Sequence, residues 1–201
     1  GLVAPDGSLR DLSAHVPDIA GQALSPDALA RIAALDPADL PEVPAGTRLG
    51  PPVGAVGKAI CIALNYSDHA AESGLAVPAE PMIFMKATSA LCGPTDPIVI
   101  PRGSRHTDWE VELGVCIGTP AKYVDEADAL SHVAGYFCGN DVSERHFQNH
   151  RAGQFTKGKS SDTFGPMGPW LVTADEVPDP QALQMWLKVN GETKQDGSTA
   201  T

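Results

Sequence analysis

The sequence predicts an α+β fold in which strands outweigh helices, with a small N-terminal domain followed by a larger domain. The 20 glycines and 18 prolines among 201 residues indicate frequent turns. The stretch from Trp109 to Ile117 alternates apolar and polar side chains with the period of a strand. Asn190-Gly191 directly follows an apolar run, which is a strong signal for a β-hairpin.

Residues 1–50 are predicted to form the small N-terminal domain and its linker. Ser25 is suited to cap a helix whose first position is Pro26, because the first helical residue needs no hydrogen bond from its backbone nitrogen. Residues 40–53 are rich in proline and glycine. They are predicted to be the linker that leads into the second domain.

Residues 51–201 are predicted to form the second domain. Short apolar runs bounded by turn-forming residues are predicted strands, and one polar stretch is predicted to be helical. Glycines and prolines predict a loop at residues 163–169. The predicted strands cover residues 58–64, 82–86, 109–117, 133–138 and 183–190, and the predicted helix covers residues 141–151.

The overall charge restricts the classes of partner. A net charge of −11 argues against nucleic acid and anionic membranes, because both require clustered Lys and Arg. A small anionic substrate stays possible, since a bound metal ion inverts the local field. The four cysteines lie far apart, which predicts reduced, buried thiols in a cytoplasmic protein. No apolar stretch is long enough to span a membrane.

Two glutamates, Glu110 and Glu112, are predicted to project from the same face of the strand at residues 109–117. Adjacent carboxylates repel each other, and burying them is unfavourable unless a cation joins them. Together with Asp141, at the end of the next apolar run, they form an all-oxygen set that suits Mg²⁺, with Mn²⁺ or Ca²⁺ as alternatives. The competing interpretation is a half-exposed strand with a solvated acidic face, which Glu-x-Glu alone favours.

His69 and Glu72 lie three residues apart in a polar segment. On a helix they share a face, so the carboxylate can orient the imidazole and stabilise its protonated form. Such a pair makes a general base. The alternative is an exposed turn with an incidental pair, which the spacing alone favours. The other histidines show no metal-ligand spacing and are assigned no role: His15, His106, His132, His146 and His150.

Residues 153–160, Gly-Gln-Phe-Thr-Lys-Gly-Lys-Ser, match the sequence pattern of a phosphate-binding loop. Such a loop needs a buried strand before it and a helix after it. Residues 144–151 are too polar for a buried strand, and the prolines and glycines of residues 162–169 cannot propagate a helix. A nucleotide site is therefore rejected, and Lys159 remains as a cation in a glycine-flanked loop.

Several segments between Ile60 and Asp196 together resemble the fumarylacetoacetate hydrolase family, specifically its bacterial acylpyruvate and diketo-acid hydrolase branch. Because several motifs of the family occur in the same order along this chain, a metal site at Glu110, Glu112 and Asp141 becomes the favoured interpretation. The resemblance implies a mixed β-roll catalytic domain of fumarylacetoacetase type at residues 51–201, with further C-terminal strands that this chain lacks. The segments are residues 65–66, 69–72, 81–86, 108–113, 139–145, 157–160, 162–169 and 189–192.

The resemblance also implies a role for each candidate residue. These roles are ligation of Mg²⁺ or Mn²⁺ by Glu110, Glu112 and Asp141, activation of water by His69 with Glu72 on a lid, binding of substrate oxygens by Arg145 and Gln148, and stabilisation of developing negative charge by Lys159.

The implied reaction is hydrolysis of a C–C bond in a 2,4-dioxo acid, either an acylpyruvate or a diketo-deoxy sugar acid, to pyruvate and a carboxylic acid. The expected partner is a small anionic keto acid, without nucleic acid or membrane, and the expected assembly is a homodimer. Because the same scaffold hosts several reactions, the alternatives are a β-keto acid decarboxylase or isomerase, a ureidoglycolate lyase, and an inactive metal-binding protein.

Overall fold

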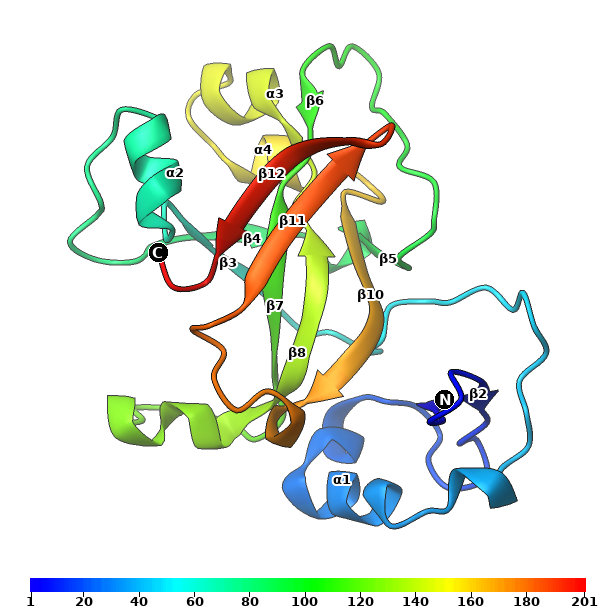
Figure 1. The fold of residues 1–201 in the computed structure, drawn as a ribbon. Helices are drawn as coiled ribbons and strands as arrows, with labels where there is room; N and C mark the ends of the chain where they lie inside the picture. The colour runs from blue at the N-terminus through cyan, green and yellow to red at the C-terminus, as the bar shows by residue number, and fades with distance from the viewer.

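The computed structural model describes residues 1–201 and has a mixed α+β architecture, which confirms the predicted fold class. A four-stranded sheet in the order β5-β10-β8-β7 forms the centre, and the β11–β12 hairpin lies across it in the view of Figure 1. Three further two-stranded sheets pair β1 with β2, β3 with β4, and β6 with β9. The helices are short and lie around these sheets (Figure 1).

The bounds of the elements are as follows. The strands are β1 (Leu2–Val3), β2 (Leu9–Arg10), β3 (Ala59–Ala63), β4 (Met82–Lys86), β5 (Leu91–Cys92), β6 (Thr107–Asp108), β7 (Val111–Ile117), β8 (Val133–Asn140), β9 (Ser143–Glu144), β10 (Gly165–Thr173), β11 (Gln184–Val189) and β12 (Glu192–Ser198). The α-helices are α1 (Pro26–Ala33), α2 (Ser67–Glu72), α3 (Arg145–His150) and α4 (Thr156–Lys159). The 3₁₀ helices are η1 (Gly21–Leu24), η2 (Pro37–Asp39), η3 (Thr88–Ala90), η4 (Glu126–His132) and η5 (Ala174–Glu176).

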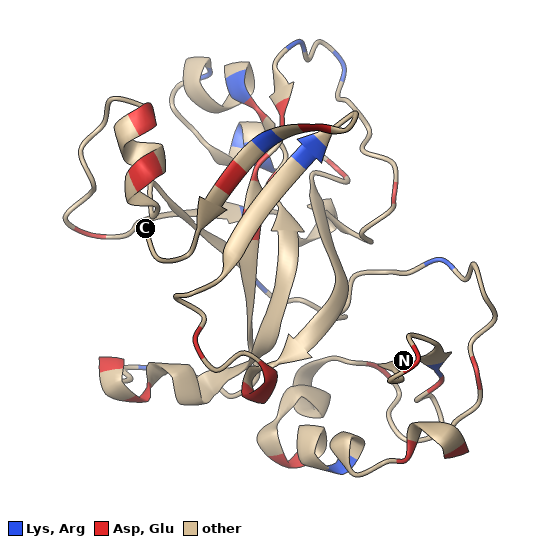
Figure 2. Cartoon of the chain, viewed as in Figure 1, with Lys and Arg blue, Asp and Glu red and all other residues tan.

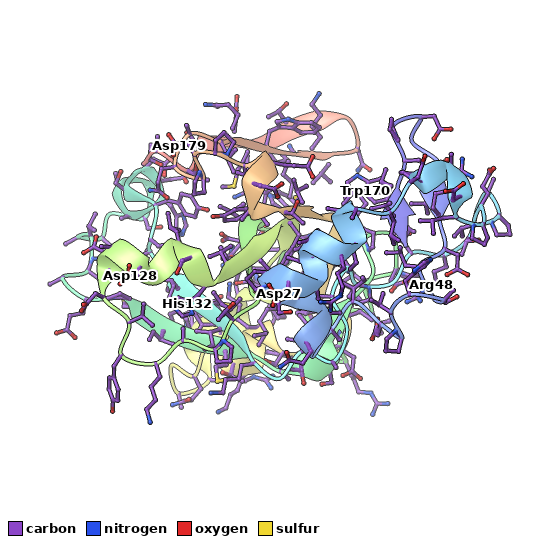
Figure 3. The ribbon with its side chains drawn as sticks, turned by 90° about the horizontal axis from the view of Figure 1, so that it is seen from below. Asp27, Arg48, Asp128, His132, Trp170 and Asp179 are labelled. Carbon is purple, nitrogen blue, oxygen red and sulfur yellow. The ribbon has the colours of Figure 1, made fainter.

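The N-terminal segment packs against the lower end of the central sheet. Helix α1 begins as predicted, with Pro26 in its first turn and the Ser25 hydroxyl accepting a hydrogen bond from the Ala28 N–H at 3.4 Å. Leu24 and Val53 share one buried cluster with two residues of the sheet, Cys116 and Ala134. Helices α1 and η4 both lie at this lower end (Figures 1 and 3). The division into domains at residue 50 stays a prediction.

Strand β7 turns its acidic face inward. Cys116 is 8% exposed, whereas its neighbours Val115 and Ile117 are 47% and 56% exposed. Because side chains alternate along a strand, the glutamate preceding this run by four positions, Glu112, shares the inward face of Cys116. Gly114 lies on the same face, where a Cβ would stand 2.1 Å from the Phe137 ring. The interpretation of a solvated acidic strand face is therefore wrong.

The predicted loop at residues 163–169 is also wrong, because β10 begins at Gly165. Its first two residues pair in parallel with β5, and the following ones pair antiparallel with β8. Pairing with two neighbouring strands overrides the local turn preference. A register shift between Gly168 and Val172 accommodates Pro169, as prolines inside sheets occur at such irregularities.

The predicted helix at residues 141–151 is shorter, since α3 starts only at Arg145. The buried carboxylate of Glu144 defines this start. It accepts hydrogen bonds from the N–H groups of His146 and Phe147 at 3.4 and 2.9 Å, and from the His106 N–H at 3.0 Å. Ser143 and Glu144 form β9 instead and pair with β6, and Asp141 and Arg145 on either side of them both line the cavity described below.

The predicted C-terminal hairpin is confirmed. Asn190 and Gly191 both have positive φ angles, 52° and 83°, as a two-residue hairpin turn requires. Strands β11 and β12 pair on either side of this turn. The hairpin forms one wall of the cavity described below.

The four cysteines are free, as predicted, but they are not all buried. Cys92 and Cys116 are buried, Cys61 is half-buried and Cys138 is exposed. Cys138 is exposed although Tyr136, two residues earlier on β8 and so on the same face, is buried. Separately, none of the helices is both long enough and apolar enough to cross a membrane.

Candidate active site

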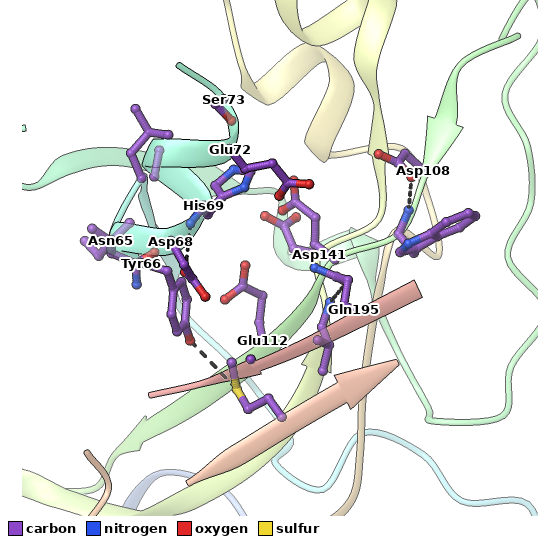
Figure 4. Close-up of a pocket in the computed structure, with 18 of the residues that line it drawn as sticks. Asn65, Tyr66, Asp68, His69, Glu72, Ser73, Asp108, Glu112, Asp141 and Gln195 are labelled. Atoms are coloured by element: carbon purple, nitrogen blue, oxygen red, sulfur yellow. Dashed lines mark hydrogen bonds between the residues drawn. The ribbon is translucent and has the colours of Figure 1, made fainter. Parts of the chain in front are cut away.

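A cavity of about 890 Å³ opens between α2, the start of β7, helices α3 and α4, and the β11–β12 hairpin. Figure 4 shows Asp68, His69 and Glu72 on one side of this cavity and Glu112 and Asp141 facing them. All the predicted site residues line this one cavity: His69, Glu72, Glu110, Glu112, Asp141, Arg145, Gln148 and Lys159. Their roles stay predictions that this arrangement supports.

The ends of β7 and β8 bring two of the carboxylates together. The Asp141 N–H donates to the Glu110 carbonyl oxygen at 2.9 Å. The Glu110 N–H donates to the Asn140 Oδ1 atom at 3.1 Å. These bonds extend the strand pairing beyond β7 itself, so the backbone fixes Glu110 beside Asp141.

Three cationic side chains reach these carboxylates from other elements. Lys159 Nζ donates to Glu110 Oε2 and to Asp141 Oδ2, both at 2.7 Å, and is 2% exposed. Arg145 Nη1 donates to Glu110 Oε1 at 2.5 Å. Lys86, 5% exposed, donates to Asp141 Oδ1. Burial lowers the pKa of Lys86, and the attraction of Asp141 only partly opposes this.

Glu112 differs from the other two carboxylates because no hydrogen bond or ion pair reaches its side chain. Burial, followed by repulsion from Glu110 and Asp141, raises the pKa of Glu112 to about 8. In this state the carboxyl is mostly protonated at neutral pH. On the floor of the cavity, formed by Lys86, Glu110, Glu112, Asp141, Arg145 and Lys159, the three cations pair with Asp108, Glu110 and Asp141, so an ionised Glu112 would be a carboxylate without a paired cation.

The donor set fits a hard divalent cation. No group of three His, Cys, Asp or Glu side chains is drawn together closely enough to ligate a metal, because Lys159 stands between Glu110 and Asp141. Glu112 is the carboxyl without a cationic partner, and its pKa is raised first by burial and then by repulsion from Glu110 and Asp141. An oxygen-preferring cation would relieve this repulsion, with Glu112, Glu110 and Asp141 as ligands.

Helix α2 closes the opposite side of the cavity. The Tyr66 hydroxyl donates to Met185 Sδ of β11 at 3.8 Å, so the start of α2 rests on the hairpin. Burial, then Glu112 and Asp68, raise the pKa of Tyr66 to about 12, and its hydroxyl stays protonated. His69 and Glu72 share α2 as predicted and both face the cavity (Figure 4). No hydrogen bond joins them in this structure.

Three cavity or floor residues are absent from the predicted site. Asp108 Oδ2 accepts a hydrogen bond from Arg145 Nε at 2.9 Å and forms an ion pair with Arg145 Nη2 at 2.8 Å. Lys86 is the last residue of the apolar strand β4, and its position as the single charged residue of that strand is the sequence signal that could have indicated a role in the site. Gln195 Oε1 accepts from the Val111 N–H at 2.7 Å, a contact between residues 84 apart that no local pattern indicates.

The phosphate-loop pattern does not have the required context. Helix α3, rather than a strand, precedes residues 153–160, and α4 ends within the pattern at Lys159. Lys159 points to the carboxylates instead. Of the histidines without a predicted role, His106, His146 and His150 form a row on the surface, with ring centroids 6.3 and 5.4 Å apart.

We expect Glu112→Gln to change how stability depends on pH when metal is removed by EDTA. The unfolded carboxyl ionises near pH 4.5 and the folded one near pH 8, so the folded wild type holds one more proton between these values. Its free energy of unfolding should therefore fall as pH rises, by at most about 1.4 kcal/mol per pH unit and by less where cavity water screens the charge. The variant should lack this slope in urea titrations at pH 5.5–7.5.

The same variant should bind Mg²⁺ at least about ten-fold more weakly in calorimetry, because one ligand charge is lost. Glu126→Gln, at an exposed position on η4, is the matched control and should behave as the wild type. Equal Mg²⁺ affinity in Glu112→Gln and wild type would contradict the assignment of Glu112 as a ligand.

Comparison with known sequences identifies the larger part of the chain. Residues 58–201 match the model of the fumarylacetoacetate (FAA) hydrolase C-terminal domain. A relative from Burkholderia multivorans, named only provisionally as a hydrolase, is 62% identical over 201 residues, which are 100% of this chain and 71% of the relative.

Solved structures agree with this match. A protein of Mycobacterium smegmatis provisionally named HpcE is 39% identical with a TM-score of 0.74, over 87% of this chain and 62% of that one. The 2-hydroxyhepta-2,4-diene-1,7-dioate isomerase of Mycobacterium marinum is 39% identical with a TM-score of 0.63, over 72% of this chain and 52% of that one. By sequence match, relatives and fold, this chain belongs to the fumarylacetoacetate hydrolase family.

Proposed function

We propose that this protein is a divalent-metal-dependent hydrolase that cleaves a C–C bond in a 2,4-dioxo acid, giving pyruvate and a carboxylic acid. Members of the family generally depend on a divalent metal. The observation that carries the proposal is one cavity with the pair His69 and Glu72 on α2 opposite the carboxylates and Lys159 on the floor. A general base that faces a buried lysine suits the attack of water on a carbonyl and the stabilisation of the negative charge that develops.

The residues divide the reaction between them. Arg145 and Gln148 bind the substrate carboxylate, with the Arg145 guanidinium already held by Asp108 and Glu110. His69 takes a proton from water, whose oxygen attacks the C4 carbonyl carbon of the substrate. The C3–C4 bond then breaks, and its electron pair goes to the pyruvate enolate, which takes up a proton at C3. A bound Mg²⁺ would act as a Lewis acid on the ketone and carboxylate oxygens.

Lys159 stabilises the enolate, whose negative charge develops beside the floor of the cavity. Its ammonium group is buried and fixed by two hydrogen bonds of 2.7 Å, so it needs no reorganisation when the charge forms. The ring of Phe84 lies 5.0 Å from Lys159 Nζ and excludes water on that side. A preorganised cation of this kind stabilises the transition state more than the bound substrate.

The experiment that tests the proposal measures pyruvate release. The protein is incubated with Mg²⁺ and a panel of 2,4-dioxo acids, and pyruvate is followed with a coupled dehydrogenase. Stoichiometric pyruvate and carboxylic acid are expected, with loss of activity in EDTA. Absence of pyruvate from every dioxo acid would overturn the proposal.

A second candidate is an isomerase, because three of the similar structures are named as isomerases. A decarboxylase on the same scaffold is the further alternative. Neither reaction needs an activated water. Decarboxylation would not need His69, whereas isomerisation would still need a base to move a proton. An ultraviolet change without any new carboxylic acid product would favour this second candidate.

The homodimer and the cytoplasmic location stay predictions. The β3–β4 hairpin exposes apolar side chains that a second copy would cover, with Ile60, Ile83 and Met85 exposed by 56%, 68% and 43%. Light scattering on the purified protein measures the subunit number.

A further inference from the structure

We propose that the end of the cavity beneath α2 binds a neutral, hydroxylated tail of the substrate and rejects a tail that ends in a second carboxylate, with Asp68 and Gln195 setting this preference. The inference rests on the proposed function, in which the keto-acid head binds at the floor. Since His69 activates the water that attacks C4, the chain beyond C4 lies on the His69 side. Asp68 is the neighbouring residue on that side (Figure 4).

The charged side chains that α2 brings to this end of the cavity are acidic apart from His69. The sequence contains no Lys or Arg between Lys58 and Lys86, and α2 carries Asp68 and Glu72 as its only charged side chains apart from His69. Figure 2 shows α2 with acidic residues alone, whereas α3 and α4 carry basic ones and the β11–β12 hairpin carries both. Neither Asp68 nor Glu72 forms an ion pair with a cation.

The cations that line the cavity are already engaged elsewhere. Arg145 and Lys159 pair with the floor carboxylates. Lys194 on β12 pairs with Glu192 at 2.6 Å and is 36% exposed. A second carboxylate of the substrate would therefore meet Asp68 without a partner of opposite charge, which is strongly unfavourable.

Asp68 and Gln195 instead offer a matched acceptor and donor. Asp68 Oδ1 accepts from the His69 N–H at 2.7 Å, which leaves Oδ2 available. Asp68 Oδ2 lies 3.7 Å from the point where a Cβ on Gly197 would stand, so this glycine leaves space beside it. Gln195 Oε1 is held by the Val111 N–H at 2.7 Å, which leaves its NH₂ group as a donor on the cavity wall. An acceptor and a donor together suit a hydroxyl group, which needs both.

The test compares three six-carbon 2-oxo acids that share the head and differ in the tail. They are 2-keto-3-deoxygluconate with hydroxyls, 2-oxohexanoate with an alkyl chain, and 2-oxoadipate with a second carboxylate. None has a C4 ketone, so calorimetry with Mg²⁺ measures binding without turnover. The expected order of affinity is hydroxylated, then alkyl, then dicarboxylate.

Two variants identify the residues responsible. Asp68→Asn keeps the oxygen that accepts from the His69 N–H and should improve binding of 2-oxoadipate relative to 2-keto-3-deoxygluconate by at least about ten-fold. Gln195→Glu keeps the bond to the Val111 N–H but loses the donor, and it should weaken 2-keto-3-deoxygluconate binding more than 2-oxohexanoate binding. Glu80→Gln removes an equal charge from an exposed position outside the cavity and should change neither ratio.

The outcomes separate this inference from the proposed function. If 2-oxoadipate binds the wild type as tightly as the hydroxylated acid, or if Asp68→Asn leaves the ratio unchanged, the tail preference is wrong while the head site stands. If none of the three acids binds, the proposed head site fails, and the inference fails with it.

Discussion

His69→Ala is expected to lower the rate of 2,4-dioxo acid hydrolysis by about 10²–10⁴-fold, the usual range for loss of a general base. His69 faces the cavity from α2, and alanine keeps the helix intact because it has the highest helix propensity. Mg²⁺ affinity should be unchanged, since the predicted ligands lie on the opposite wall (Figure 4). Stopped assays of pyruvate release and calorimetry with Mg²⁺ measure the two quantities.

The matched control is His146→Ala. His146 is an exposed histidine on α3, directly after Arg145, and it does not line the cavity. Its replacement should leave the rate within a few-fold of wild type. Loss of Mg²⁺ binding together with activity in His69→Ala would mean that His69 is a ligand or a structural residue. Full activity in His69→Ala would favour decarboxylation, which needs neither an activated water nor a general base.

The sequence predicted those parts of the site that depend on local patterns. Alternation predicted Glu110 and Glu112 on one face of a strand at residues 109–117; both line the cavity, although β7 begins only at Val111. The three-residue spacing predicted His69 and Glu72 on one helix, and both lie on α2. The sequence also predicted the Asn190-Gly191 hairpin, because only a few residue pairs adopt two positive φ angles readily.

The sequence could not predict features that depend on pairing between distant segments. Residues 163–169 look like a loop locally, yet pairing with β5 and β8 makes them the start of β10. Likewise, a glutamate such as Glu144 is expected at the surface. It is fully buried here, where its carboxylate caps α3 and accepts a hydrogen bond from the His106 N–H. Gln195 enters the site only because the hairpin folds back across β7.

Lys159→Met is expected to lower kcat by about 10²–10³-fold with a smaller change in KM, as for the removal of one preorganised group that stabilises an oxyanion. The charge of Lys159 is needed most when the enolate forms, so the loss falls on the transition state. Methionine fills a similar volume. The fold around Phe84 and α4 should therefore persist, and only the ammonium group is lost.

The same substitution separates catalysis from structural charge balance. In EDTA it leaves Glu110 and Asp141 without the ammonium that bridges them, so the variant should lose about 3 kcal/mol of stability in urea titrations. Added Mg²⁺ should restore most of that stability but not kcat. Recovery of both would reduce Lys159 to a structural counter-ion.

Lys157→Met is the control, because Lys157 is exposed on the same helix and donates only to the Arg151 carbonyl oxygen, at 3.1 Å. It should keep wild-type kcat and stability. Calorimetry of the wild type with Mg·ATP completes the comparison, since a lysine that grips phosphates would give micromolar binding that Lys159→Met abolishes. We expect no such binding, because Lys159 Nζ is directed at two carboxylates and no strand precedes its loop.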